Sequence, residues 1–149
     1  MLPSPVLLYL HGFASGPSSH KARVLSERFA AIGVRVVVPD LTPGPDGFER
    51  SSPSSMLVIA EALLADAEPP HAVIGSSLGG YLASVIASRH PSVERLVLLA
   101  PAFRLFERWS ARLTGQELAD WRASGLETMH FASNPRWCIA WRVFEDAGG

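Results

Sequence analysis

The residues with the clearest chemical potential form the pentapeptide Gly75-Ser76-Ser77-Leu78-Gly79. A serine hydroxyl becomes an effective nucleophile when it is exposed, has a base and faces donors that stabilise the oxyanion it creates. The pattern G-x-S-x-G exposes its serine on a tight strand-to-helix turn, which requires small residues two positions before and after it. We therefore predict that Ser77 is a nucleophile and that Gly75 and Gly79 support the turn.

A simpler interpretation of this pentapeptide is a glycine-rich turn without chemistry, such as a phosphate cradle. The chain has neither the G-x-G-x-x-G pattern nor a P-loop lysine, so this alternative is the less favoured one.

A second motif, His11-Gly12-Phe13, ends the first apolar run of the chain. In folds that carry this type of elbow, the loop after that strand supplies one oxyanion donor, and the residue after the nucleophile supplies the other. The predicted donors are the backbone N–H groups of Phe13 and Leu78. His11 and Gly12 are predicted to shape the loop, and the two loops can converge because parallel strands end at one edge of a sheet.

The surrounding residues predict the elements that position these motifs. Continuous apolar runs are typical of strands that are buried on both faces, and they occur at 6–10, 34–38, 71–74 and 96–100. Apolar residues at helical spacing predict helices over 19–32, from Pro53 to 67, and from the Gly79 turn to Arg89. This alternation demands a parallel sheet with right-handed crossovers, which predicts an α/β fold of three layers, an αβα sandwich.

Two further stretches have a different character. Residues 41–55 are rich in Pro, Gly and Ser and predict a long surface loop. After Pro101 the pattern predicts helices at 103–113 and 116–123, and a strand or lid segment at 137–144.

Composition excludes several classes of function. The chain has 149 residues, 48% of them apolar, and a formal net charge of −1, which gives no indication of nucleic-acid or membrane-surface binding. The single cysteine, Cys138, excludes an internal disulfide and a thiol metal cluster. We expect no cofactor and no metal. Without a targeting signal or a run long enough to span a bilayer, a cytoplasmic location is expected.

The chain resembles small α/β-hydrolase esterases of the YqiA type. The resemblance rests on Tyr9 to Phe13 followed by Ser15, Pro17, Ser18, Lys21 and Ala22, on Ile74 to Tyr81, and on Leu98 to Ala102. It covers residues 5–102 and implies an α/β-hydrolase domain with this core, followed by a lid-like helical segment at about 103–144. It also implies hydrolysis of carboxylic esters or thioesters without a cofactor.

The resemblance also implies an acid and a histidine on strands beyond the lid, and this sequence ends at Gly149 before such strands. The alternatives within the chain are weak. His130 lies in the lid-like segment, His90 follows the elbow helix, and Asp40 is more simply a turn residue. Glu145 and Asp146 stand near the end of the sequence. The triad is therefore expected to be incomplete, and a non-catalytic pseudo-hydrolase that binds a ligand or partner remains the alternative function.

An incomplete sheet has a consequence for assembly. The strand at 96–100 would be left as an apolar edge, which is open to pairing with other chains. We expect the isolated chain to be marginally stable or to self-associate through this edge.

Overall fold

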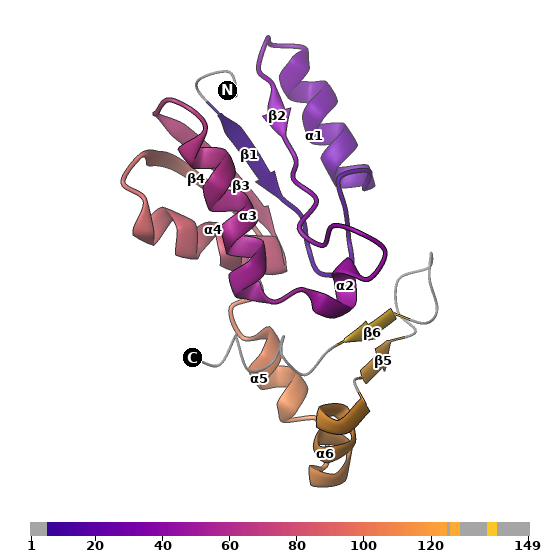
Figure 1. Cartoon of the computed structure of the whole chain (residues 1–149). Coiled ribbons are helices and arrows are strands. Elements are labelled where there is room, and N and C mark those ends of the chain that lie inside the picture. The colour runs from indigo at the N-terminus through magenta and orange to yellow at the C-terminus, as the bar shows by residue number, and fades with distance from the viewer. Residues whose placement is uncertain (1–5, 125, 129–136, 140–149) are drawn as a thin grey trace. The chain divides into compact units, whose positions relative to one another are not determined.

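The computed structural model describes residues 6–124, 126–128 and 137–139. Its main sheet has four strands, which are β1 (Leu7–Leu10), β2 (Val36–Val37), β3 (His71–Ser76) and β4 (Val93–Leu99). They lie in the order β2-β1-β3-β4, and every neighbouring pair is parallel. The parallel sheet predicted from the sequence is confirmed (Figure 1).

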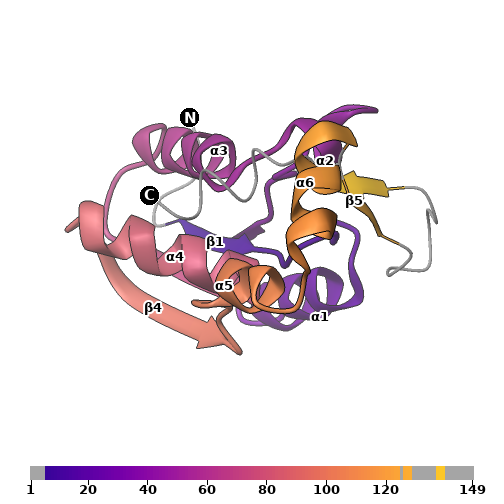
Figure 2. The same cartoon turned by 90° about the horizontal axis from the view of Figure 1, so that it is seen from below.

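Three helices connect these strands in turn, namely α1 (His20–Ala30), α3 (Pro53–Ala65) and α4 (Leu78–Arg89). Figure 2 shows α1 on one face of the sheet and α3 and α4 on the other. The three-layer αβα arrangement predicted from the alternating pattern is therefore present. It brings the carboxyl ends of β1 and β3, and the loops that follow them, to the same edge of the sheet.

Helix α1 begins where its sequence predicts and ends two residues before the predicted end. The hydroxyl of Ser19 accepts a hydrogen bond from the N–H of Ala22 (3.3 Å), which is a standard N-terminal cap. Gly33 adopts a φ of 76° just after the helix, a conformation in which glycine is unstrained. Ile32, which the prediction included in the helix, lies two residues past its last residue, Ala30, and is 71% exposed.

Each face of the sheet has its own apolar packing. On the α1 side, Ala22, Leu25 and Phe29 pack with Leu7, Tyr9 and Ile74. Helix α4 is buried more deeply, as its nearly uniform apolar sequence predicts, with Leu82, Ala83 and Ile86 all at 0% exposure. At about 25 cal/mol for each Å² of apolar surface removed from water, such burial is the main force holding the helices on the sheet.

The predicted loop at 41–55 is wrong in part. It contains a short helix, α2 (Gly47–Arg50), and Leu41 and Ser51 within the stretch are buried. The Ser51 hydroxyl donates to the carbonyl of Gly47, which closes the turn of α2. The start of α3 is fixed by reciprocal side-chain bonds between Ser52 and Ser55. Serines that indicated a loop therefore act as capping groups instead.

The chain divides into two compact units, residues 1–41 with 57–103 and residues 42–56 with 104–149. The first contains the four-stranded sheet. Besides α2, the described parts of the second unit are α5 (Leu105–Ser110), α6 (Gly115–Ser124), and the antiparallel pair β5 (Leu126–Thr128) and β6 (Trp137–Ile139). The predicted segment at 137–144 is thus a strand as far as Ile139, and its remainder lies outside the described residues. Among the described helices, none is both long and apolar enough to cross a bilayer.

Candidate active site

Ser77 occupies the turn between the last residue of β3 and the first residue of α4. Its φ of 55° and ψ of −119° lie in a region that residues with a side chain rarely adopt. Such strain costs on the order of 1–3 kcal/mol and persists only where the surrounding structure imposes it. The Ser77 N–H donates to the carbonyl of Leu99 (3.0 Å), and its carbonyl accepts from Gly80 (2.9 Å) and Ala102 (3.0 Å). The side chain is half-buried, so it remains open to solvent.

The glycines on either side of Ser77 are required by close backbone approach. A Cβ on Gly75 would lie 2.2 Å from the carbonyl oxygen of Gly79, and a Cβ on Gly79 would lie 2.1 Å from that of Leu10. The first contact lies inside the turn, and the second joins the turn to the end of β1. The two small residues of the motif thus hold the strand-to-helix geometry that was predicted for an elbow.

The loop after β1 lies beside Ser77. A Cβ on Gly12 would lie 3.3 Å from the Ser77 Cβ and 3.9 Å from its Oγ. Phe13 follows Gly12 in this loop, and Leu78 is the first residue of α4, where an amide has no carbonyl partner within the helix. Both predicted oxyanion donors therefore belong to segments in contact with or adjacent to Ser77.

His11 is fixed in its neutral form by two hydrogen bonds. The ring is 2% exposed, its Nε2 accepts from the N–H of Leu41 (3.3 Å), and its Nδ1 lies 3.1 Å from the carbonyl of Gly12, to which it donates. Burial lowers the pKa of His11, against the opposing effects of the Gly12 carbonyl and the Asp40 charge. Both ring nitrogens of His11 are occupied by hydrogen bonds within the fold, so His11 is not available as a base for Ser77.

No histidine is hydrogen-bonded to Ser77 within residues 6–124. His90 caps the C-terminus of α4, and its Nε2 lies 3.1 Å from Oε1 of Glu61. His20 is exposed at the start of α1. His71 begins β3, as the apolar run at 71–74 predicts, and it is buried.

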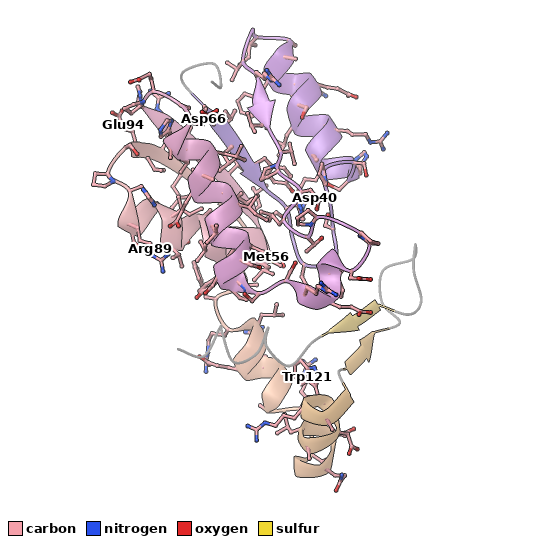
Figure 3. All side chains as sticks on the ribbon, in the orientation of Figure 1. Asp40, Met56, Asp66, Arg89, Glu94 and Trp121 are labelled. Atoms are coloured by element: carbon pink, nitrogen blue, oxygen red, sulfur yellow. The ribbon has the colours of Figure 1, made fainter. Side chains whose placement is uncertain are left out.

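The other candidates for the acid and the base divide into two groups. His130, Glu145 and Asp146 lie outside the described residues. Asp40 is exposed on the segment after β2, and Figure 3 shows it toward the carboxyl ends of the strands, where its charge acts on the pKa of His11.

One polar neighbour of the turn was not predicted as part of the site. The Nζ of Lys21, on the first turn of α1, donates to the Oγ of Ser76 at 2.7 Å. The one feature of the sequence that distinguished this residue was that Lys21 is the only lysine of the chain.

A groove of about 450 Å³ lies elsewhere on the sheet. It runs along the α1 side between Phe29 and Val97 and includes Glu94, which Figure 3 places at the amino end of β4. The carboxyl ends of the strands, where Ser77 stands, are at the opposite edge. This groove is therefore not the site of the serine chemistry.

Comparison with known proteins identifies the family. Residues 6–134 match the model of the Uncharacterised protein family (UPF0227). The chain belongs to this family. Solved structures with the same fold include the mouse alpha/beta hydrolase domain-containing protein 10 (20% identity, TM-score 0.76) and a putative hydrolase from Agrobacterium vitis (24%, TM-score 0.79). The two matches include 98% and 96% of this UPF0227 chain, and they include 61% and 60% of the two solved structures. The UPF0227 chain therefore has an α/β-hydrolase fold.

Curated relatives of the UPF0227 chain include one lipase and one esterase by name. It is 36% identical over 109 residues to the monoacylglycerol lipase ABHD6 of Mus musculus, which is 66% of this chain and 31% of that protein. It is 37% identical over 102 residues to the pimeloyl-[acyl-carrier protein] methyl ester esterase of Aromatoleum aromaticum, again 66% of this chain and 39% of that protein. The UPF0227 chain thus spans about a third of the length of these relatives.

Proposed function

We propose that this chain is a serine hydrolase, or the nucleophile-bearing part of one, that acts on carboxylic esters or thioesters. The observation that carries the proposal is the strained, half-buried Ser77 between two glycines whose hydrogens face backbone carbonyls. Strain of this kind at a non-glycine residue is characteristic of active sites. The names of the curated relatives, a lipase and a methyl ester esterase, support carboxylic esters as the substrate class.

The chemistry proposed for Ser77 has two stages. Its Oγ forms a bond to the acyl carbon while a base accepts the hydroxyl proton, and the carbonyl oxygen becomes an oxyanion facing the N–H groups of Phe13 and Leu78. The oxyanion then reforms the carbonyl, and the alcohol or thiol leaves with that proton. Water attacks the acyl-serine in the second stage, which releases the acid and restores the hydroxyl.

The base in this scheme is a histidine, and within residues 6–124 none is hydrogen-bonded to Ser77. Removing a triad member leaves a residual acceleration of about 10³–10⁴ over water from the oxyanion hole and binding. Slow hydrolysis of an activated ester therefore does not distinguish a complete enzyme from one without its base.

Covalent labelling gives a sharper test. We expect a fluorophosphonate probe to label the chain at Ser77 and to leave Ser77→Ala unlabelled. Ser88→Ala is the matched control, because it removes an exposed hydroxyl from α4 away from the elbow and leaves the nucleophile in place. Mass spectrometry of the adduct identifies the modified serine.

The alternative is a pseudo-hydrolase that uses the same fold to bind a ligand or partner. A folded chain that forms no Ser77 adduct, even with excess probe and long incubation, would favour this alternative and overturn the proposal of a hydrolase.

A further inference from the structure

Lys21 and Ser77 are linked through a single intervening side chain. The Nζ of Lys21 donates to the Oγ of Ser76 at 2.7 Å, and Ser76 directly precedes Ser77 in the chain. Ser76 is the last residue of β3 and is 4% exposed. The lysine itself is exposed along its side chain, so its ammonium group reaches inward from the helix surface to a buried hydroxyl. The arrangement joins the first turn of α1 to the residue on which the elbow begins.

Tyr9 is a buried neighbour of the same hydroxyl. It is 1% exposed on β1 and packs in the core cluster that includes Ala22, the residue after Lys21. Burial raises the pKa of Tyr9, and the nearby Ser76 side chain opposes that rise. Ser76 is therefore hydrogen-bonded to α1 and has Tyr9 of β1 as a neighbour. A buried hydroxyl held by a charged donor has few alternative rotamers, so the end of β3 is held in one position.

Ser77 needs such support because its own backbone is strained. Its N–H is held by the Leu99 carbonyl on β4. The hydrogen bond from Lys21 holds the preceding residue, Ser76, from the α1 side of the sheet. The strained φ of 55° at Ser77 is thus fixed from two directions, through its own backbone and through the side chain of its neighbour.

The charge of Lys21 adds an electrostatic effect to this support. A hydrogen bond with a charged donor is about twice as strong as a neutral one. It also holds an ammonium group at the side chain of the residue that precedes Ser77 in the chain. A fixed positive charge near a developing oxyanion stabilises it without needing to reorganise.

We propose that Lys21 is a positioning residue for Ser77, which acts through the hydroxyl of Ser76 to hold the elbow and to favour negative charge at the serine. The expected effect of Lys21 on reactivity rests on the proposed function. The inference goes beyond that function because it assigns a role to a residue outside the elbow and the oxyanion loop.

The test compares the second-order rate constant of fluorophosphonate labelling in a set of variants. Lys21→Met keeps the length of the side chain and removes its charge, so we expect labelling to slow by about tenfold, which corresponds to ~1.4 kcal/mol. Lys21→Arg retains a charged donor and is expected to restore most of the rate. Arg23→Met is the matched control, since it removes an exposed charge from the same turn of α1 and is expected to leave the rate unchanged.

A double-mutant cycle tests whether Lys21 acts through Ser76. If it does, Lys21→Met in the Ser76→Ala background causes little further loss, because the contact is already broken. Additive losses, an equal loss in Arg23→Met, or failure of Lys21→Arg to restore the rate would each overturn the proposal. Thermal melting of every variant separates these effects on labelling from general destabilisation. If Lys21→Met does not fold, the labelling rates of Ser76→Ala and Lys21→Arg provide the same comparison.

Backbone amide shifts give a measurement that does not depend on activity. We expect the ¹⁵N and ¹H resonances of Ser77 and Leu78 to move in Lys21→Met and Ser76→Ala, and to stay near their original positions in Lys21→Arg and Arg23→Met. If the unmodified chain forms no Ser77 adduct, the proposed hydrolase function fails while these shifts still decide whether Lys21 positions the elbow. Unmoved resonances in Lys21→Met would contradict the inference.

Discussion

At the scale of single residues, the site depends on where the backbone leaves no room for a side chain. Gly79 illustrates the balance of two effects. It lies in the first turn of α4, where alanine is intrinsically preferred over glycine by about 0.8–1.0 kcal/mol. The carbonyls of Leu10 and His11, however, would lie 2.1 and 2.5 Å from its added Cβ. Both are backbone atoms, which cannot move aside as the end of a flexible side chain can. The steric effect is therefore the larger of the two.

We expect Gly79→Ala to lower the free energy of unfolding by roughly 1–3 kcal/mol, the usual range for overpacking, in spite of its better helix propensity. It should also slow labelling of Ser77, because relief of the clash separates the elbow from the end of β1. Chemical denaturation measures the first effect and the fluorophosphonate probe the second.

Gly16→Ala is the control for this substitution, because an added Cβ at Gly16 would have no neighbour within 4 Å. A Gly79→Ala chain as stable and as reactive as the unmodified chain would show that the elbow does not need the close approach of β1.

At the scale of elements, His11 connects the end of β1 to the segment that follows β2. Its Nε2 accepts from the Leu41 N–H, so protonation of this nitrogen would break the connection. Burial is the main cause of its lowered pKa. The folded state therefore binds a proton less readily than the unfolded chain, whose histidine pKa is about 6.5.

The sign of the pH effect follows from this difference. The stabilising contribution of neutral His11 is complete above the unfolded pKa of about 6.5, and it is lost progressively as the pH falls toward the lower pKa of the folded state. The slope cannot exceed about 1.4 kcal/mol for each pH unit for a single group. Stability should thus decrease on mild acidification.

We expect His11→Gln to reduce this dependence, since a glutamine oxygen can accept from Leu41 but does not titrate. Urea denaturation of both chains between about pH 5 and 8 measures the effect, and their difference in unfolding free energy should change with pH. His20→Gln, at an exposed histidine, is the control and should leave the dependence as it was. A pH-independent difference between His11→Gln and the unmodified chain would refute the assignment.

At the scale of the whole molecule, β4 is the strand whose surroundings matter most for assembly. In the described residues it pairs with β3 alone, and its other edge has no strand beside it. Leu96 is 39% exposed and Val97 is 48% exposed, so neither face of the strand is fully covered. An apolar edge of this kind is a template for pairing with another chain. We propose that the chain, when isolated, self-associates along β4.

Lysine at an exposed strand position opposes such pairing, so we expect Val97→Lys to shift the chain toward the monomer in size-exclusion chromatography with light scattering. Val58→Lys is the matched control. Val58 is 65% exposed on α3, and the same change there adds the same charge without altering the sheet edge. If the unmodified chain is monodisperse and monomeric, or if both lysine variants shift assembly equally, the proposal fails.

Much of this molecule was predictable from local pattern. The apolar runs that predicted strands, the stop at Gly33 and the start of a helix at Pro53 all depend on preferences of residues within one turn or one strand. The segment at 41–55 was not predicted correctly because serine favours loops and helix caps alike, and only its partners decide between them. The sequence also gave no reason to place residues 42–56 in the same compact unit as residues 104–149.

The candidate site divides in the same way. The sequence by itself determined the strand-to-helix turn at Ser77 and predicted its two glycines and the His11-Gly12-Phe13 loop as parts of the site, because such a turn admits few residue types at fixed spacing. Only the tertiary structure decided that His11 has both ring nitrogens occupied and that Lys21 reaches Ser76 across 55 positions of sequence. Spacing along a chain specifies local turns, whereas a hydrogen bond between distant residues exists only after the helices have packed on the sheet and brought their side chains together.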